Sequence, residues 1–101
     1  MTDIKALTGV GAVLSAAHRS REGVLHGHTW EIIAWFNEGR CAVELQAELN
    51  SHLKMFDHQI LGDDVAWGEA LGKCLLLGLG CVKVEVNRPS ERLYAVVEKL
   101  Q

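Results

Sequence analysis

The sequence has little proline, few cysteines and no long apolar run, and each scarcity narrows what the chain can be. One proline among 101 residues, with an apolar fraction of 49%, argues against a disordered chain and predicts a packed core. Cys41, Cys74 and Cys81 are odd in number and lack C-x-x-C spacing, so we expect neither a disulfide framework nor a thiolate metal site. We expect all three to be small buried residues in a reducing cytoplasm.

Charge of either sign is not concentrated anywhere in the chain. Ten Lys and Arg stand against 13 Asp and Glu, for a formal net charge of −3. Scattered basic residues predict no nucleic acid and no anionic membrane as a partner. No secretory leader pattern opens the sequence, and "CLLLGLGCV" is far shorter than the ~20 residues of a membrane span. The length is that of one core, so we expect a single domain over residues 1–101.

Two early stretches alternate with the period of a β-strand. The first runs from Val10 to His18 and the second from His26 to Phe36, with the polar "RSREG" between them. We therefore expect a hairpin of two long strands. In each stretch the residues of one parity are the candidates to face inward. They are Val10, Ala12, Leu14, Ala16, His18, His26, His28, Trp30, Ile32, Ala34 and Phe36.

The middle of the chain changes to helical spacing. Leu45, Leu49, Leu53 and Phe56 predict an amphipathic helix beginning near Glu44. A second helix is expected after a cap at Asp64, running through Leu71, Leu75 and Leu76 and stopped by Gly78 and Gly80.

The last third returns to alternation. Val82–Val86 reads as a third strand, and "RLYAVV" after the "NRPS" turn reads as a fourth, although Leu93, Val96 and Leu100 also fit a short helix. The order is then ββααββ. It predicts an α+β fold, a four-stranded antiparallel sheet with two helices on one face. The uncovered face and edges predict a homo-oligomer.

Three histidines form the main candidate site. His26 and His28 are two residues apart on a strand, so their rings share a face. His18, on the paired strand, can complete a three-imidazole set that leaves one coordination position of a zinc ion open, the pattern of a catalytic site. The alternative for an H-x-H pair is two satisfied core histidines.

Asp57 and His58 form a second candidate. An adjacent carboxylate can fix the tautomer of an imidazole and raise its basicity, as in an acid/base pair. The plainer alternative is that Asp57 caps a turn and His58 is exposed.

Four segments follow one another along the chain: "LSAAH", "LHGHTW", "FDHQILGD" and "VKVEV...RLYAVV". Taken together, they resemble the 6-pyruvoyltetrahydropterin synthase and 6-carboxytetrahydropterin synthase family over nearly the whole chain. The resemblance implies the ββααββ tunnelling fold and zinc held by His18, His26 and His28. It also implies a substrate of the 7,8-dihydroneopterin triphosphate type, Asp57 and His58 as catalytic partners, and trimers stacked as hexamers with sites at subunit interfaces.

The sequence departs from the family at the base. The family's catalytic cysteine stands four residues before the first histidine of H-G-H, where this chain has Glu22. A branch of the family that carries glutamate there releases 6-hydroxymethyl-7,8-dihydropterin, and this chain resembles it in that respect. A desolvated carboxylate can take a proton, which makes Glu22 a candidate base; the alternative is an exposed loop residue between Arg19 and Arg21.

Two further departures concern substrate binding. Val86 stands where the family's ring-anchoring glutamate is expected, and Glu85, the nearest candidate, points to the opposite face unless the strand carries a bulge. The family's "P-T-x-E" segment reads "AWGE", which retains Glu69 as a ring contact or as a first-turn carboxylate.

Three hypotheses follow from these residues. The first is a zinc-dependent lyase with Glu22, Asp57 and His58 as acid/base groups. The second is a divergent homologue that acts on another heterocycle, and the third is a non-catalytic metal- or ligand-binding homologue.

Overall fold

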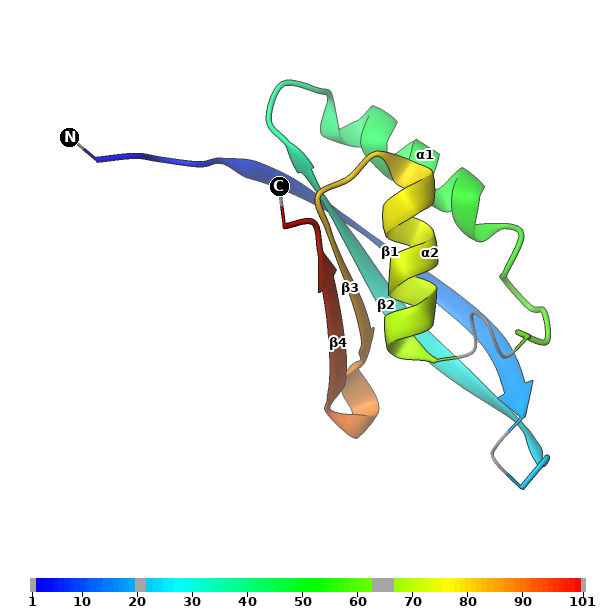
Figure 1. Cartoon of the computed structure of the whole chain (residues 1–101). Helices are drawn as coiled ribbons and strands as arrows, with labels where there is room; N and C mark the ends of the chain where they lie inside the picture. Colours follow the sequence, from blue (N-terminus) through cyan, green and yellow to red (C-terminus); the bar gives the residue numbers. More distant parts are fainter. Residues whose placement is uncertain (1, 20–21, 63–66, 101) are drawn as a thin grey trace.

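A four-stranded antiparallel sheet carries both helices on one face (Figure 1). The computed structural model describes residues 2–19, 22–62 and 67–100. The strands β1 (Leu7–Arg19), β2 (Leu25–Asn37), β3 (Lys83–Arg88) and β4 (Leu93–Glu98) lie in chain order across the sheet. Helices α1 (Ala42–Leu53) and α2 (Gly68–Leu79) stand between β2 and β3 in the chain. The predicted α+β fold with ββααββ order is confirmed.

The core lies between the helices and one face of the sheet. Most of the alternating strand residues predicted to face inward are buried there, Leu14 and Ile32 among them, because one parity of each strand faces the helices; Ala12, His26 and His28 are half-buried. Leu45 and Leu49 of α1 and Leu75 of α2 close the core from the other side. Helix α1 packs on β1, whereas α2 packs on β3 and β4.

Several sequence-based bounds change in the structure. Helix α2 begins at Gly68, with Trp67 at its cap, and the predicted cap Asp64 lies outside the described residues. Gly78 is inside the helix; Gly80, with a φ of 68°, ends it. The segment after β3 forms a 3-10 turn, η1 (Pro89–Glu91), and then the strand β4, so the predicted strand is confirmed over the helical alternative.

The prediction of three buried cysteines is wrong for Cys41, which is exposed just before α1. Cys74 is half-buried and Cys81 is buried. Burial raises the pKa of the Cys81 thiol, which keeps it protonated and unreactive.

The connection after α1 covers part of the outer edge of β1, which sequence patterns did not predict. The Ala17 amide donates to the Gln59 carbonyl (2.9 Å), and the Leu61 amide donates to the Ala17 carbonyl (2.7 Å). These bonds form a short parallel bridge between Ala17 and Ile60. They also fix Asp57 and His58 beside the end of β1.

The face of the sheet turned away from the helices exposes apolar side chains. Val13 and Tyr94 each have a relative exposure of 66%, and Val96 is 55% exposed. Ile33 and Trp35 line a shallow hollow of about 470 Å³ on the same face. In the described part of the chain, no helix combines the length and the apolar character needed to cross a membrane.

Substitutions within α2 test the packing of the core. Leu75 is fully buried and Leu77, two residues on, is 83% exposed. Leu75→Ala is expected to lower the free energy of unfolding by about 2–5 kcal/mol, because it leaves a cavity. Leu77→Ala, the matched control, should change it by no more than about 0.5 kcal/mol. Denaturant titration measures both, and equal losses would contradict this packing.

Candidate metal centre

Strand pairing brings His18, His26 and His28 together. In the β1–β2 register His18 is directly opposite His26, and His28 is opposite Ala16. All three belong to the parity that faces the helices, at the hairpin end of the sheet. Their ring centroids are 4.5 to 4.8 Å apart, and one nitrogen from each ring lies within 4.8 Å of the others. This spacing fits three ligands of one shared metal ion.

His18 is the buried member of the cluster. Its relative exposure is 2%, and neither ring nitrogen has a hydrogen-bond partner among the described residues. An unpaired polar group in such a position is costly, so its presence needs an explanation. A metal ion bound by His18 would supply a partner for one of these nitrogens, and the residues present therefore fit such a group.

The electrostatic environment favours the ligating form of the rings. Burial lowers the pKa of His18, and the neighbouring His26 and Arg88 add to the effect. Burial also lowers the pKa of His28, with further lowering by Arg88 and the other two imidazoles, while Glu91 opposes it. Neutral imidazole is the form that binds metal ions.

A pocket of about 250 Å³ opens beside His18 at the start of α2. The ring of Trp67 lies edge-on to His18 with centroids 5.1 Å apart, and Trp30 forms another wall. Glu69, in the first turn of α2, also lines the pocket. One carboxylate and two indoles thus stand beside the histidine cluster, which suits a flat, polar-edged molecule.

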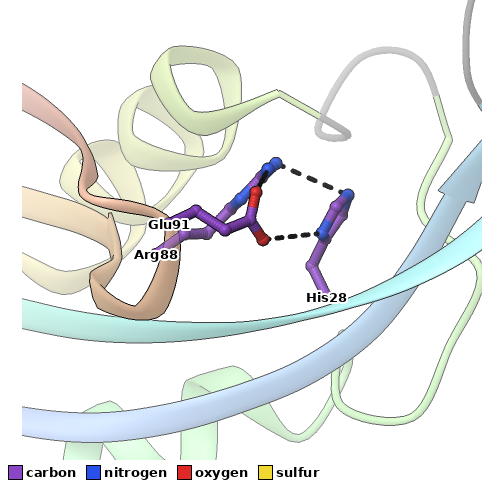
Figure 2. A network of polar contacts seen from close by, with 3 residues as sticks. All are labelled: His28, Arg88 and Glu91. Carbon is purple, nitrogen blue, oxygen red and sulfur yellow. Dashed lines mark hydrogen bonds and ion pairs between the residues drawn. The ribbon is translucent and has the colours of Figure 1, made fainter.

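Arg88 and Glu91 complete the surroundings of His28 (Figure 2). Arg88 Nη1 donates to His28 Nε2 at 3.4 Å, and Glu91 Oε1 lies 3.7 Å from His28 Nδ1. Arg88 and Glu91 are also ion-paired with each other. Sequence reasoning missed both residues. Arg88 follows Val84 and Val86 on the same parity, a signal that could have placed it on the histidine face.

Asp57 and His58 form a hydrogen-bonded pair. Asp57 Oδ1 accepts from the Ser15 amide at 3.0 Å, and Asp57 Oδ2 is 2.9 Å from His58 Nδ1. His58 has a φ of 58°, and its side chain is 80% exposed. It borders a hollow lined by Ser15, Ala17 and Thr29, whose parity faces away from the helices, and also by His28 of the cluster. The Asp57–His58 pair thus lies at the edge of β1, beside the end of the sheet that carries the histidines.

The three candidate glutamates occupy different surroundings. Glu22 is exposed in the loop that joins β1 to β2, between two of the clustered histidines in the chain. Glu69 lies in the pocket described above. Glu85 pairs with Ile33 in a regular ladder without a bulge and accepts a hydrogen bond from Trp35 Nε1 at 2.6 Å. It is on the opposite face of the sheet, so the structure does not bring it to the histidines.

Comparison with solved structures identifies the fold. A 6-pyruvoyl tetrahydropterin synthase from Caenorhabditis elegans superposes with a TM-score of 0.75 at 16% sequence identity, covering 93% of this chain and 95% of that one. This chain has the tunnelling fold. No family model matches the sequence, and no curated protein matches it. At this identity the likeness concerns the architecture of the chain.

Replacement of one clustered histidine tests the centre. His26→Ala is expected to abolish stoichiometric metal, because two imidazoles and water hold a divalent ion far less tightly than three imidazoles. His52→Ala is the control, since His52 lies against Gly78 of α2, outside the cluster. Elemental analysis of protein purified without chelator measures both. Full metal content in His26→Ala would rule out the centre.

The Asp57 carboxylate gives a pH-dependent prediction. Its hydrogen bond from the Ser15 amide lowers the pKa of Asp57, and His58 adds to the effect. The ionised form is therefore preferred in the folded state, and its stabilisation is complete above the usual carboxyl pKa and lost as pH falls through the depressed value. Asp57→Asn should thus lower the free energy of unfolding most at neutral pH. A wild-type-to-variant difference that stays constant into strong acid would contradict this.

Proposed function

We propose that this protein is a zinc-dependent lyase that acts on a 7,8-dihydroneopterin triphosphate-like substrate and releases 6-hydroxymethyl-7,8-dihydropterin. The observation that carries the proposal is the convergence of His18, His26 and His28 beside a pocket on the tunnelling fold. The C. elegans protein of the same fold is named for pterin synthesis, which supports the substrate class.

Zinc is the proposed metal because three neutral imidazoles leave one of its four positions free. A bound zinc ion supplies Lewis acidity, which polarises a substrate oxygen and acidifies the neighbouring C–H and O–H groups. The chain contributes a partly buried site next to it. His18 is buried, and Trp30 and Trp67 restrict water on one side of the cluster. Such surroundings strengthen electrostatic interactions with a bound substrate.

The pocket provides the groups that would orient the ring of the substrate. Glu69 can accept hydrogen bonds from the amide and amine groups along one edge of a pterin. Trp67, 44% exposed, can offer its ring as an apolar wall for the flat heterocycle. Both residues come from the start of α2, so one helix terminus would position the ring relative to the histidines.

Glu22 is the proposed base in place of a thiolate. It belongs to the short loop between the strands that hold His18 and His26, which keeps it near the cluster along the chain. Asp57 and His58 are the proposed proton-transfer pair. His58 borders a hollow whose strand residues mostly have the parity that faces away from the helices, and we assign the pair to the histidine cluster of a neighbouring subunit. The exposed apolar side chains of that face support the assembly as trimers or hexamers that this requires.

A different heterocycle is the second candidate substrate. Glu85, the candidate ring anchor, accepts a hydrogen bond from Trp35 on the face turned away from the helices, and an indole, Trp67, lines the pocket. Both observations favour a zinc enzyme with altered ring recognition.

Incubation of the zinc-loaded protein with 7,8-dihydroneopterin triphosphate tests the proposal. We expect a hydroxymethyl product, identified by mass. Glu22→Gln should reduce turnover by about 10²–10⁴-fold with zinc content unchanged, because a general base is lost. Glu38→Gln, at an exposed position in the β2–α1 connection, is the control. Absence of any product, beside an active tetrahydropterin synthase, would reject the lyase, and turnover of an analogue with another ring would support the second candidate.

A further inference from the structure

We infer that Arg88 and Glu91 set the metal affinity of the histidine centre with opposite signs: Glu91 strengthens binding by orienting His28, and Arg88 weakens it by competing for the same ring nitrogen. The inference rests on the metal centre of the proposed function, and it does not depend on the identity of the substrate. It concerns two residues that the sequence patterns did not assign to the metal site.

The contacts of His28 define the tautomer of its ring. Arg88 Nη1 can only donate, so at 3.4 Å it points at a lone pair on His28 Nε2. In the neutral ring the proton is then on Nδ1, which faces the Glu91 carboxylate at 3.7 Å (Figure 2). In this tautomer the lone pair of His28 that could bind a metal ion is on Nε2.

Glu91 is placed as an outer carboxylate for a metal-bound histidine. A carboxylate that accepts the second N–H of a ligating imidazole fixes the ring orientation and raises its basicity. Arg88 Nη2 donates to Oε2 of the Glu91 carboxylate, and that carboxylate keeps Oε1 toward His28. Its negative charge also favours a divalent cation nearby.

Arg88 has the opposite effect on the same ring. Its guanidinium occupies the lone pair that a metal ion would need on Nε2, and its positive charge repels the ion. The Arg88 side chain is only 22% exposed, so solvent screens this repulsion less than it would on an open surface. Metal binding therefore requires the Arg88 guanidinium to move away from His28 Nε2. Arg88 can do so and stay ion-paired with Glu91.

The turn η1 keeps Arg88 and Glu91 close to each other and to His28. Pro89 opens the turn, and the Arg92 amide closes it on the Pro89 carbonyl at 3.1 Å. Arg88 is anchored in β3, where it pairs with Leu93 of β4. Because the turn spans only three residues, Glu91 stays within reach of both Arg88 and His28.

Zinc titration against a competing chelator tests the inference. Glu91→Ala should weaken zinc binding by about tenfold or more, the usual effect of losing an outer carboxylate. Arg88→Met, which keeps the length of the side chain and removes its charge, should tighten binding by about fivefold or more, the equivalent of one hydrogen bond. The double variant should return near the wild-type affinity. Circular dichroism of each variant serves to check that it is folded.

The surface pair Arg40–Glu48 supplies matched controls. Its side chains are ion-paired at 2.7 Å and about half exposed, and neither residue belongs to the histidine cluster. Arg40→Met and Glu48→Ala should leave the zinc affinity within about twofold, because exposed pairs are screened. If Arg88→Met weakens binding, or if both Arg88 and Glu91 variants behave like these controls, the inference is wrong.

A second readout uses the metal-free protein. Ring-nitrogen chemical shifts of His28 should report the Nδ1–H tautomer in the wild type, and a shift toward Nε2–H in the double variant, which loses the Arg88 contact to Nε2 and the Glu91 contact to Nδ1. An unchanged tautomer in that variant would overturn the inference. Failure of the proposed lyase is distinguishable, because absent turnover with the expected affinity changes rejects only the substrate chemistry. A wild-type protein that binds no zinc would reject the centre and this inference together.

Discussion

The register between β1 and β2 is the constraint on which the candidate site depends. It places Leu14 opposite Trp30 in the core and His18 opposite His26 at the hairpin end. A slip of one residue would turn every side chain of a strand to the other face, so the register is fixed by the burial of the apolar positions. The packing that stabilises the sheet thereby also aligns the three imidazoles.

The close approach of α2 to the sheet creates the pocket beside this cluster. A Cβ at Gly72 would lie 2.7 Å from Val97 Cγ2 of β4, so only glycine allows the helix to pack at this distance. The helix then begins above His18, with Trp67 against the imidazole and Glu69 in the pocket. Gly68 and Gly72 of α2 both lie where the helix packs tightly on β4.

The sequence predicted the features that follow from side-chain period. The alternation of apolar and polar residues predicted the strands, the residues of each strand that face inward, and the shared face of His26 and His28. It could do so because a strand places every second residue on one side. It could not give the contacts of His28 with Arg88 and Glu91, which depend on the backbone of a three-residue 3-10 turn. Nor could it show that His58 borders the far face, since that follows from loop hydrogen bonds to β1.

The polar groups of the candidate site are divided between the two faces of the sheet, so the association of subunits would affect the composition of the site as well as stability. The histidine cluster, Glu69 and Arg88 lie on the helix-covered face, whereas the Asp57–His58 pair borders the other. His28 of the cluster also lines the hollow beside His58. In the proposed lyase, a second copy would bring its own pair to the cluster. Burial of Val13, Tyr94 and Val96 between copies would then stabilise the same arrangement that completes the site.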